Sequence, residues 1–228
     1  MAFPIQFTPP MNCESNRSNA KGRRQNWIID ERKCLSFSEV ETLRKQSGKL
    51  LCHGLKSSNY SLVWKWYMVE LGLGAGLRVS EMCSLSVGDA LCDDSKSSLI
   101  VHGKGNKIRA VWMSSEFKNT TKTYIGCLKR FCHAVGPESP MFPSPRGKAL
   151  TKRALQKAFK IMIYEAGLPA RYSNHSMRHT YATFLLRASN NDYRFVQRQL
   201  GHASISTTQV YASVLESEGR KALEKLYG

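Results

Sequence analysis

The chain has few acidic residues and no long apolar run, and both shortages restrict what it can be. Its 228 residues include 17 Asp and Glu against 34 Lys and Arg, which leaves a formal net charge of +17. A surplus of this size favours a polyanionic partner, with nucleic acid as the first candidate. No stretch is long and apolar enough to span a bilayer, and residues 1–18 lack the pattern of a secretory signal. We therefore expect no membrane partner.

Cysteine is present, but in no metal-binding pattern. The seven cysteines are scattered, with neither CxxC nor the Cys/His spacing of a structural zinc site. Their odd number and their distribution indicate reduced thiols, mostly buried, in a reducing intracellular compartment. We expect no metal site and no cofactor.

The first part of the chain separates into a tail and an ordered region. Residues 1–34 are polar and locally basic without sustained periodicity, so we expect a flexible basic arm. Ser36 and Glu39 have the spacing of a capping box, which predicts that a helix begins there. Residues 59–76 predict a buried helix that ends in glycines. These glycines follow a helix rather than a strand and lack GxGxxG spacing, so a nucleotide-binding loop is rejected.

The middle of the chain carries the one clear β signal. Residues 97–103 and 107–113 are β-rich runs around a Gly/Asn turn, which predicts a hairpin with Lys104 at its tip. Helices are expected over residues 115–135, after Thr151, and in four short segments from residue 175 onward, broken at Asn190, Gly201 and around Glu216. The predicted fold class is therefore mainly α with a small antiparallel β-sheet (α+β).

The helix after Thr151 has two contrasting faces. Leu155, Phe159 and Met162 share an apolar face, whereas the basic residues Arg153, Lys157 and Lys160 share another. A basic face is usually only solvated, but in this chain a phosphate-facing surface is an equal alternative. These three residues are candidate DNA-binding positions.

Groups suited to phosphate chemistry stand at four separated places. They are Arg78, Lys104, the pair His175 and Arg178, and the pair His202 and Tyr211. Taken singly, each has an ordinary structural explanation, such as a surface arginine or a packed tyrosine. Taken together, they suit attack on a DNA phosphodiester: two arginines meet the added charge, and a phenol activated by basic neighbours is the nucleophile. A lysine whose pKa is lowered beside arginines can protonate the leaving oxygen.

Four motifs carry a family resemblance. GLRVSEMCSLSVGD, HGKGNKIRAVWM, HSMRHTYATFLL and LGHASISTTQVYAS resemble, in order and spacing, the tyrosine recombinase or phage integrase family, particularly its Xer-like members, over roughly residues 35–215. The resemblance implies a catalytic domain over 35–228 and a catalytic set comprising Arg78, Lys104, His175, Arg178, His202 and Tyr211. Glu81 matches an acidic family position whose side chain would orient Arg78 without itself contacting DNA. The alternative for Glu81 is an ordinary surface pair with Arg78.

The function implied by the resemblance is site-specific DNA recombination through a 3′-phosphotyrosine on Tyr211, without ATP or metal. The implied partners are a double-stranded DNA recombination site, further copies of the chain in a tetramer, and accessory proteins, in a cytoplasmic, nucleoid-associated setting. A core-binding domain of about a hundred residues usually precedes the catalytic domain, and 34 residues stand there in this sequence. Residues 216–228 predict a helix that either packs on its own core or is exchanged between protomers. Two other functions stay open: a type IB topoisomerase-like relaxing enzyme, and a catalytically idle DNA-binding accessory factor.

Overall fold

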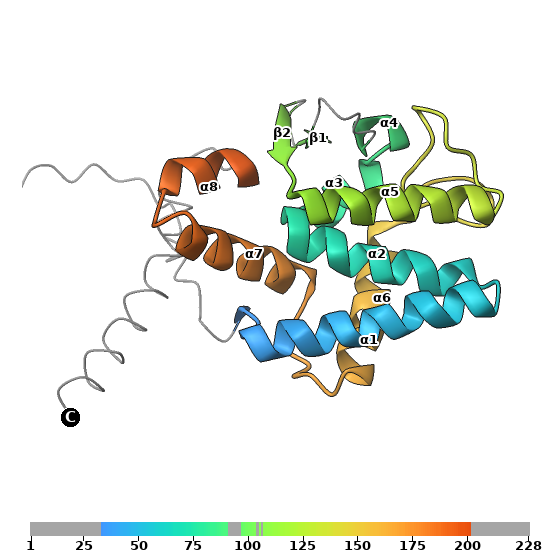
Figure 1. Ribbon diagram of the computed structural model, residues 1–228, viewed down its shortest axis with the longest axis horizontal. Helices are drawn as coiled ribbons and strands as arrows, with labels where there is room; N and C mark the ends of the chain where they lie inside the picture. Colours follow the sequence, from blue (N-terminus) through green and yellow to red (C-terminus); the bar gives the residue numbers. More distant parts are fainter. Residues whose placement is uncertain (1–32, 91–96, 104, 106, 202–228) are drawn as a thin grey trace, which may run out of the picture.

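The computed structural model describes residues 33–90, 97–103, 105 and 107–201, in which helices predominate (Figure 1). Their buried apolar side chains form one large cluster and a second, small one between α7 and α8. The helices are α1 (Phe37–Lys56), α2 (Tyr60–Ala75), α3 (Val79–Ser84), α4 (Val87–Ala90), α5 (Ser115–Arg130), α6 (Lys152–Glu165), α7 (Asn174–Ala188) and α8 (Tyr193–Leu200). The strands are β1 (Ser98–His102) and β2 (Ile108–Trp112). The predicted class, mainly helical with a small antiparallel sheet, is confirmed.

The helix boundaries follow the capping signals in the sequence. The Ser36 side chain accepts a hydrogen bond from the backbone of Glu39, and the Glu39 carboxylate accepts one from the backbone of Ser36. The Thr151 side chain accepts a hydrogen bond from the N–H of Ala154 and caps α6. The helix expected over 115–135 ends earlier, at Arg130, because Cys132 adopts a left-handed conformation with φ 57°.

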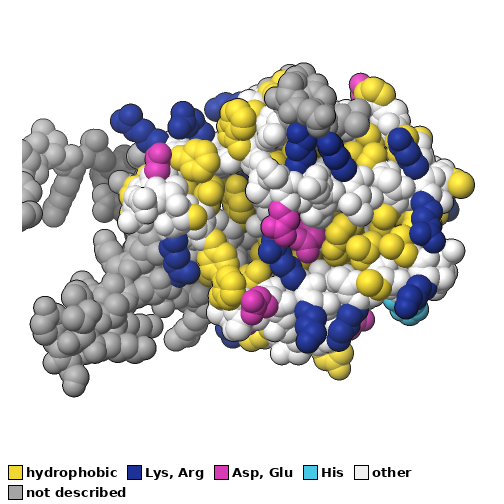
Figure 2. Space-filling model, in the orientation of Figure 1, with side chains coloured by type: hydrophobic (Ala, Val, Ile, Leu, Met, Phe, Trp, Pro, Cys, Tyr) yellow, Lys and Arg dark blue, Asp and Glu magenta, His cyan; other side chains and the backbone are white. Residues whose placement is uncertain are grey.

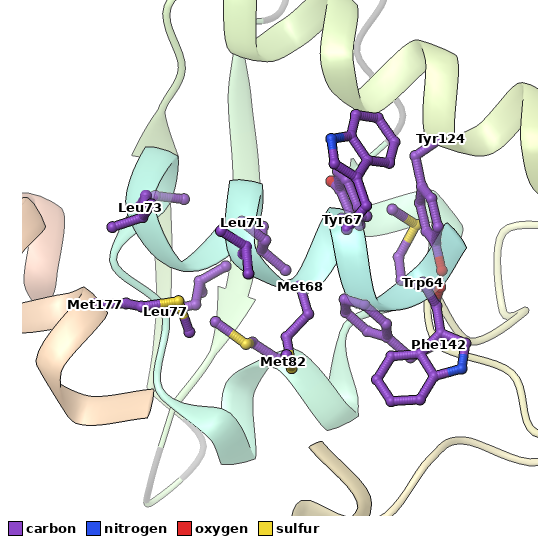
Figure 3. Packing of buried hydrophobic residues seen from close by; sticks show 14 of the residues in the cluster. Trp64, Tyr67, Met68, Leu71, Leu73, Leu77, Met82, Tyr124, Phe142 and Met177 are labelled. Atoms are coloured by element: carbon purple, nitrogen blue, oxygen red, sulfur yellow. Dashed lines mark hydrogen bonds between the residues drawn. The ribbon is translucent and has the colours of Figure 1, made fainter. Parts of the chain in front are cut away.

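Helix α2 lies at the centre of the fold, between α1, α5 and α7 (Figure 1). Aromatic side chains gather at one end of its core and aliphatic ones at the other (Figure 3). Tyr67 and Tyr124 stack with their ring centroids 4.0 Å apart, and Phe142 packs beside both rings. At the aliphatic end, glycine lets α7 approach α2 closely, because a Cβ on Gly72 would lie 2.7 Å from the side chain of Met177 in α7. The glycines of α2 therefore serve close helix packing.

The hairpin packs one face on the core and leaves the other exposed. Its register pairs Leu99 with Val111 and Val101 with Arg109. Leu99, Val101 and Val111 are buried, whereas Ile108 and Trp112, which alternate with the buried positions, are exposed. This alternation places Arg109 on the side of the strand that faces the protein.

One expectation about cysteine is wrong for the residues that the structure describes. Only Cys127 among the five described cysteines is buried, while Cys52 and Cys132 are exposed and Cys34 and Cys83 are half-buried. The reason is position, since Cys52 lies on the solvent side of α1 and Cys132 follows the end of α5.

Basic side chains are spread over the face shown in Figure 2, with few acidic ones between them.

Candidate active site around Glu81

The site is built where α2 ends and α3 begins. Gly76 ends α2 in the left-handed region with φ 62°, which turns the chain and places Arg78 directly before α3. A side chain on Gly76 would collide with the ring of Tyr181 in α7. Glu81 lies in the first turn of α3, and its carboxylate accepts a hydrogen bond of 2.8 Å from the backbone N–H of Arg78. The turn therefore directs Glu81 back toward the core.

Glu81 is the centre of a cluster of three arginines. Its Oε1 accepts hydrogen bonds of 2.8 Å from Nη1 of Arg78 and from Nη1 of Arg109. Its Oε2 accepts a 2.9 Å hydrogen bond from Nη2 of Arg109 and lies 3.8 Å from Nη1 of Arg178. Only 3% of Glu81 is exposed, which excludes an ordinary surface pair with Arg78. The predicted role of Glu81 in orienting Arg78 gains support from these contacts.

The charge state of Glu81 follows from this surrounding. Burial by itself raises the pKa of the carboxyl, but the hydrogen bonds and charges of the arginines outweigh burial and lower the pKa to about 2. Glu81 is therefore ionised at neutral pH. Three guanidinium groups and one carboxylate leave the cluster with a net charge of +2, which suits an anion.

Arg109 was missed by the sequence analysis. It grips Glu81 with both terminal nitrogens, and its Nε donates a 3.2 Å hydrogen bond to the backbone carbonyl of Gln199 in α8. The hairpin was predicted, and strict alternation along β2 puts Arg109 on the same side as the buried Val111. An arginine at a core-facing strand position requires a buried partner, and this signal could have found it.

Arg178 and His175 stand one turn apart on α7. Arg178 is 4% exposed, and it donates hydrogen bonds of 2.7 Å to the carbonyl of Gly76 and 2.6 Å to the carbonyl of Leu200. His175 is exposed. Although the residue keeps an exposed surface, the protein around it removes part of the water from its ring. This desolvation, followed by the charges of Arg178 and Arg78, lowers the pKa of His175, so its imidazole is mostly neutral at neutral pH. The structure thus brings Arg78, His175 and Arg178 together.

The other predicted catalytic residues lie outside the described part of the chain. These are Lys104, His202 and Tyr211, and the proposed exchanged tail over 216–228 falls there too. The structure does describe residues that lie next to Lys104 and His202 in the sequence. The N–H of Gly103 donates a 2.7 Å hydrogen bond to the carbonyl of Lys107 and closes the base of the hairpin turn. Helix α8 ends at Leu200, where Arg178 holds the last carbonyl.

The basic face of α6 is not uniform. Arg153 and Lys157 are exposed. The ammonium of Lys160 instead donates hydrogen bonds of 2.6 Å and 2.7 Å to the carbonyls of Ala170 and Tyr172. Lys160 therefore holds the loop that leads into α7, whether or not it also meets DNA. The DNA-binding role of all three residues stays a prediction.

Neither a membrane-spanning helix nor a metal-ligand cluster is present in the part of the chain that the structure describes. No helix in the described ranges is long and apolar enough to cross a membrane. Within the same ranges, no group of three or more His, Cys, Asp or Glu side chains could hold a metal ion.

The sequence of this chain is similar to those of known proteins over most of its length. The phage integrase family matches residues 35–218 of this chain. A tyrosine recombinase XerC from Anoxybacillus flavithermus is 37% identical over 155 residues, which cover 67% of this chain and 51% of that protein. XerC from Bacillus subtilis is 34% identical over 151 residues, which cover 64% of this chain and 48% of that protein. The chain spans about half the length of the curated relatives it matches.

Solved structures share the fold. The XerH site-specific recombinase in a post-cleavage complex with palindromic difH substrate aligns with a TM-score of 0.69 and 23% identity, over 86% of this chain and 53% of that one. The XerA recombinase aligns with a TM-score of 0.66 and 28% identity, over 86% of this chain and 65% of that one.

Proposed function

Because this chain belongs to the phage integrase family, we propose that it is a site-specific DNA recombinase that breaks and rejoins strands through Tyr211. The observation that carries the proposal is the arginine cluster on Glu81, with Arg78 half-exposed and a neutral His175 beside it. Relatives reported above are named as recombinases, which favours joining of two DNA sites over relaxation of one.

The cluster suits the charge that develops during phosphoryl transfer. Attack on a phosphodiester adds negative charge to the non-bridging oxygens, and fixed guanidinium groups stabilise it without reorganisation. The partly exposed guanidinium of Arg78 can contact the phosphate. The buried Arg178 adds its positive charge at the same place. Glu81 and Arg109 keep both side chains in place through the buried contacts. Because this charge is already present, we propose that cleavage requires no metal ion.

The bond changes assign the remaining roles. The oxygen of Tyr211 attacks phosphorus, the bond to the 5′ oxygen breaks, and a 3′-phosphotyrosine forms. The phenol must lose its proton, and a neutral His175 can accept it. The leaving 5′ oxygen must gain a proton, which Lys104 supplies, while His202 donates a hydrogen bond to the phosphate. The freed 5′-hydroxyl of a partner strand then attacks the phosphotyrosine and restores the phenol.

The partners follow from this reaction. Strand exchange needs two double-stranded sites with two cleaving subunits at each, so we propose a tetramer of this chain on DNA. Arg153 and Lys157 on the exposed side of α6 are proposed to contact phosphates, with Lys160 supporting the loop behind them. The formal charge of +17 supports a DNA partner.

Trapping of the covalent intermediate tests the proposal. The protein is incubated with a pool of nicked duplexes of random sequence, in which cleavage releases a short fragment and leaves the enzyme attached. Attached DNA is then sequenced to identify the site. Wild type should form the adduct in excess EDTA, and Tyr211→Phe should form none because only the attacking oxygen is removed.

The exposed Tyr164 on α6 provides a matched control. Tyr164→Phe should form the adduct like wild type. An adduct formed by Tyr211→Phe would refute the assignment of the nucleophile, and an adduct that needs added Mg²⁺ would refute the metal-independent mechanism.

A further inference from the structure

The end of α8 is attached to strand β2 through the side chain of Gln199. This side chain is 3% exposed. Its Oε1 accepts a 2.9 Å hydrogen bond from the N–H of Trp112, and its Nε2 donates a 3.3 Å hydrogen bond to the carbonyl of the same residue. The amide therefore pairs with β2 as a residue of a neighbouring strand would.

The backbone of the same residue is connected to the arginine cluster. The carbonyl of Gln199 accepts the hydrogen bond from Nε of Arg109, whose other two nitrogens hold Glu81. The carbonyl of the next residue, Leu200, accepts from Arg178. The last two residues of α8 are thus fixed to β2, to Arg109 and to Arg178 at once.

The chain that leaves α8 passes close to this attachment. Gly201 has φ 64°, and a Cβ on it would lie 2.6 Å from Cδ of Arg109. The left-handed turn and the close approach both require glycine at this position. His202 follows directly, and Tyr211 stands nine residues further along.

We infer that Gln199 is a positioning residue for the attack of Tyr211, an inference that rests on the proposed function. By attaching the end of α8 to β2, Gln199 sets the point and direction from which the chain continues toward His202 and Tyr211, relative to Arg78 and Arg178. Gln199 contacts neither nucleophile nor phosphate in this role. Reaction rates depend steeply on the geometry of the attacking atom, so a loosened attachment slows attack.

Gln199→Met tests the inference, because methionine keeps the length and apolar stem of glutamine but cannot pair with the backbone of Trp112. DNA affinity and the rate of adduct formation at saturating DNA are measured separately on the trapped site. We expect unchanged affinity and a rate lower by about 10²-fold, the loss that a 1 Å misplacement of reacting groups can cause. Gln199→Glu, which keeps the acceptor but loses the donor, should give an intermediate rate.

A second substrate separates attack from departure of the leaving group. A 5′-bridging phosphorothioate has a sulfur that leaves without needing a proton. Gln199→Met should lose the same factor on this substrate as on the normal phosphodiester, because attack by Tyr211 is slowed in both. Rescue by sulfur would instead place the effect of Gln199 on the leaving group, and it would overturn the inference.

Controls distinguish the possible failures. Gln156→Met makes the same substitution at an exposed position of α6 and should cleave like wild type. Thermal melting checks that each variant folds, and if Gln199→Met does not, Gln199→Glu carries the same comparison. Wild-type rates in a folded Gln199 variant would overturn this inference alone. Absence of any adduct with wild type would overturn the proposed function, and this inference with it.

Discussion

Removal of the charge on Glu81 should destabilise the fold strongly, although the side chain keeps its shape. In Glu81→Gln, the amide has nearly the volume of the carboxylate, but it no longer balances the guanidinium groups of Arg78, Arg109 and Arg178. Arg109 and Arg178 are largely buried and cannot recover their hydration. Breaking a buried ion pair from one side leaves an uncompensated charge and typically costs about 3–5 kcal/mol.

The pKa of Glu81 supplies an independent magnitude. A decrease from 4.5 to about 2 corresponds to about 3 kcal/mol of preferential stabilisation of the ionised form, at roughly 1.4 kcal/mol per pH unit. Both routes predict a loss of about 3 kcal/mol in the free energy of unfolding at neutral pH. With a urea m-value of about 2–3 kcal/mol per molar, the unfolding midpoint should fall by about 1 M.

The pH dependence of this difference gives a sharper test. The folded-state pKa of Glu81 is lowered, so its contribution is complete above the pKa of the unfolded chain and disappears as the pH falls toward about 2. The gap between wild type and Glu81→Gln should therefore narrow as the pH falls from about 4.5 to 2. His179, whose pKa burial and nearby charges lower to about 4, also weakens the fold in acid. Both proteins share this effect, so it cancels in the difference.

Urea titrations followed by far-UV circular dichroism measure the gap, and Glu70→Gln is the matched control. Burial is the main cause that raises the pKa of Glu70, with the nearby charge of Glu116 acting in the same direction and Arg44 opposing both. Its neutralisation should leave stability unchanged or slightly increased at neutral pH. Equal stability of Glu81→Gln and wild type, or a gap that does not change with pH, would refute the charge-balance reasoning.

Three further outcomes are expected. Gly76→Ala should lower the free energy of unfolding by more than about 1 kcal/mol, because the left-handed turn at Gly76 is packed against the ring of Tyr181. Gly167→Ala is the control: Gly167 has φ 66° but open space around it, so its substitution should cost less in the same urea titration. Lys160→Met should lower stability because two carbonyls lose their ammonium donor, while Lys157→Met should leave stability unchanged and reduce the salt dependence of DNA binding by about one unit of slope. Lys104→Ala should cleave a phosphodiester slowly and recover on a 5′-bridging phosphorothioate, and failure to recover would indicate a lysine that binds phosphate or supports the hairpin.

Local signals in the sequence determined much of the architecture. The capping box at Ser36, the cap at Thr151 and the β-rich runs around residue 104 correctly predicted where α1, α6 and the hairpin lie. These features depend on neighbours within a few positions along the chain, so sequence spacing suffices to find them. The family motifs likewise named Arg78, His175 and Arg178, which the structure brings together.

Tertiary structure alone decided what those residues contact. From the sequence, Glu81 could form either a surface pair with Arg78 or a buried support for it. Its burial among three arginines, from the N-cap of α3, from β2 and from α7, excluded the surface pair. Arg109 and Gln199 are 90 positions apart, and their contact exists only because α8 packs against the hairpin. Side-chain partners across such distances depend on how helices and strands pack, and no local pattern in the sequence encodes that packing.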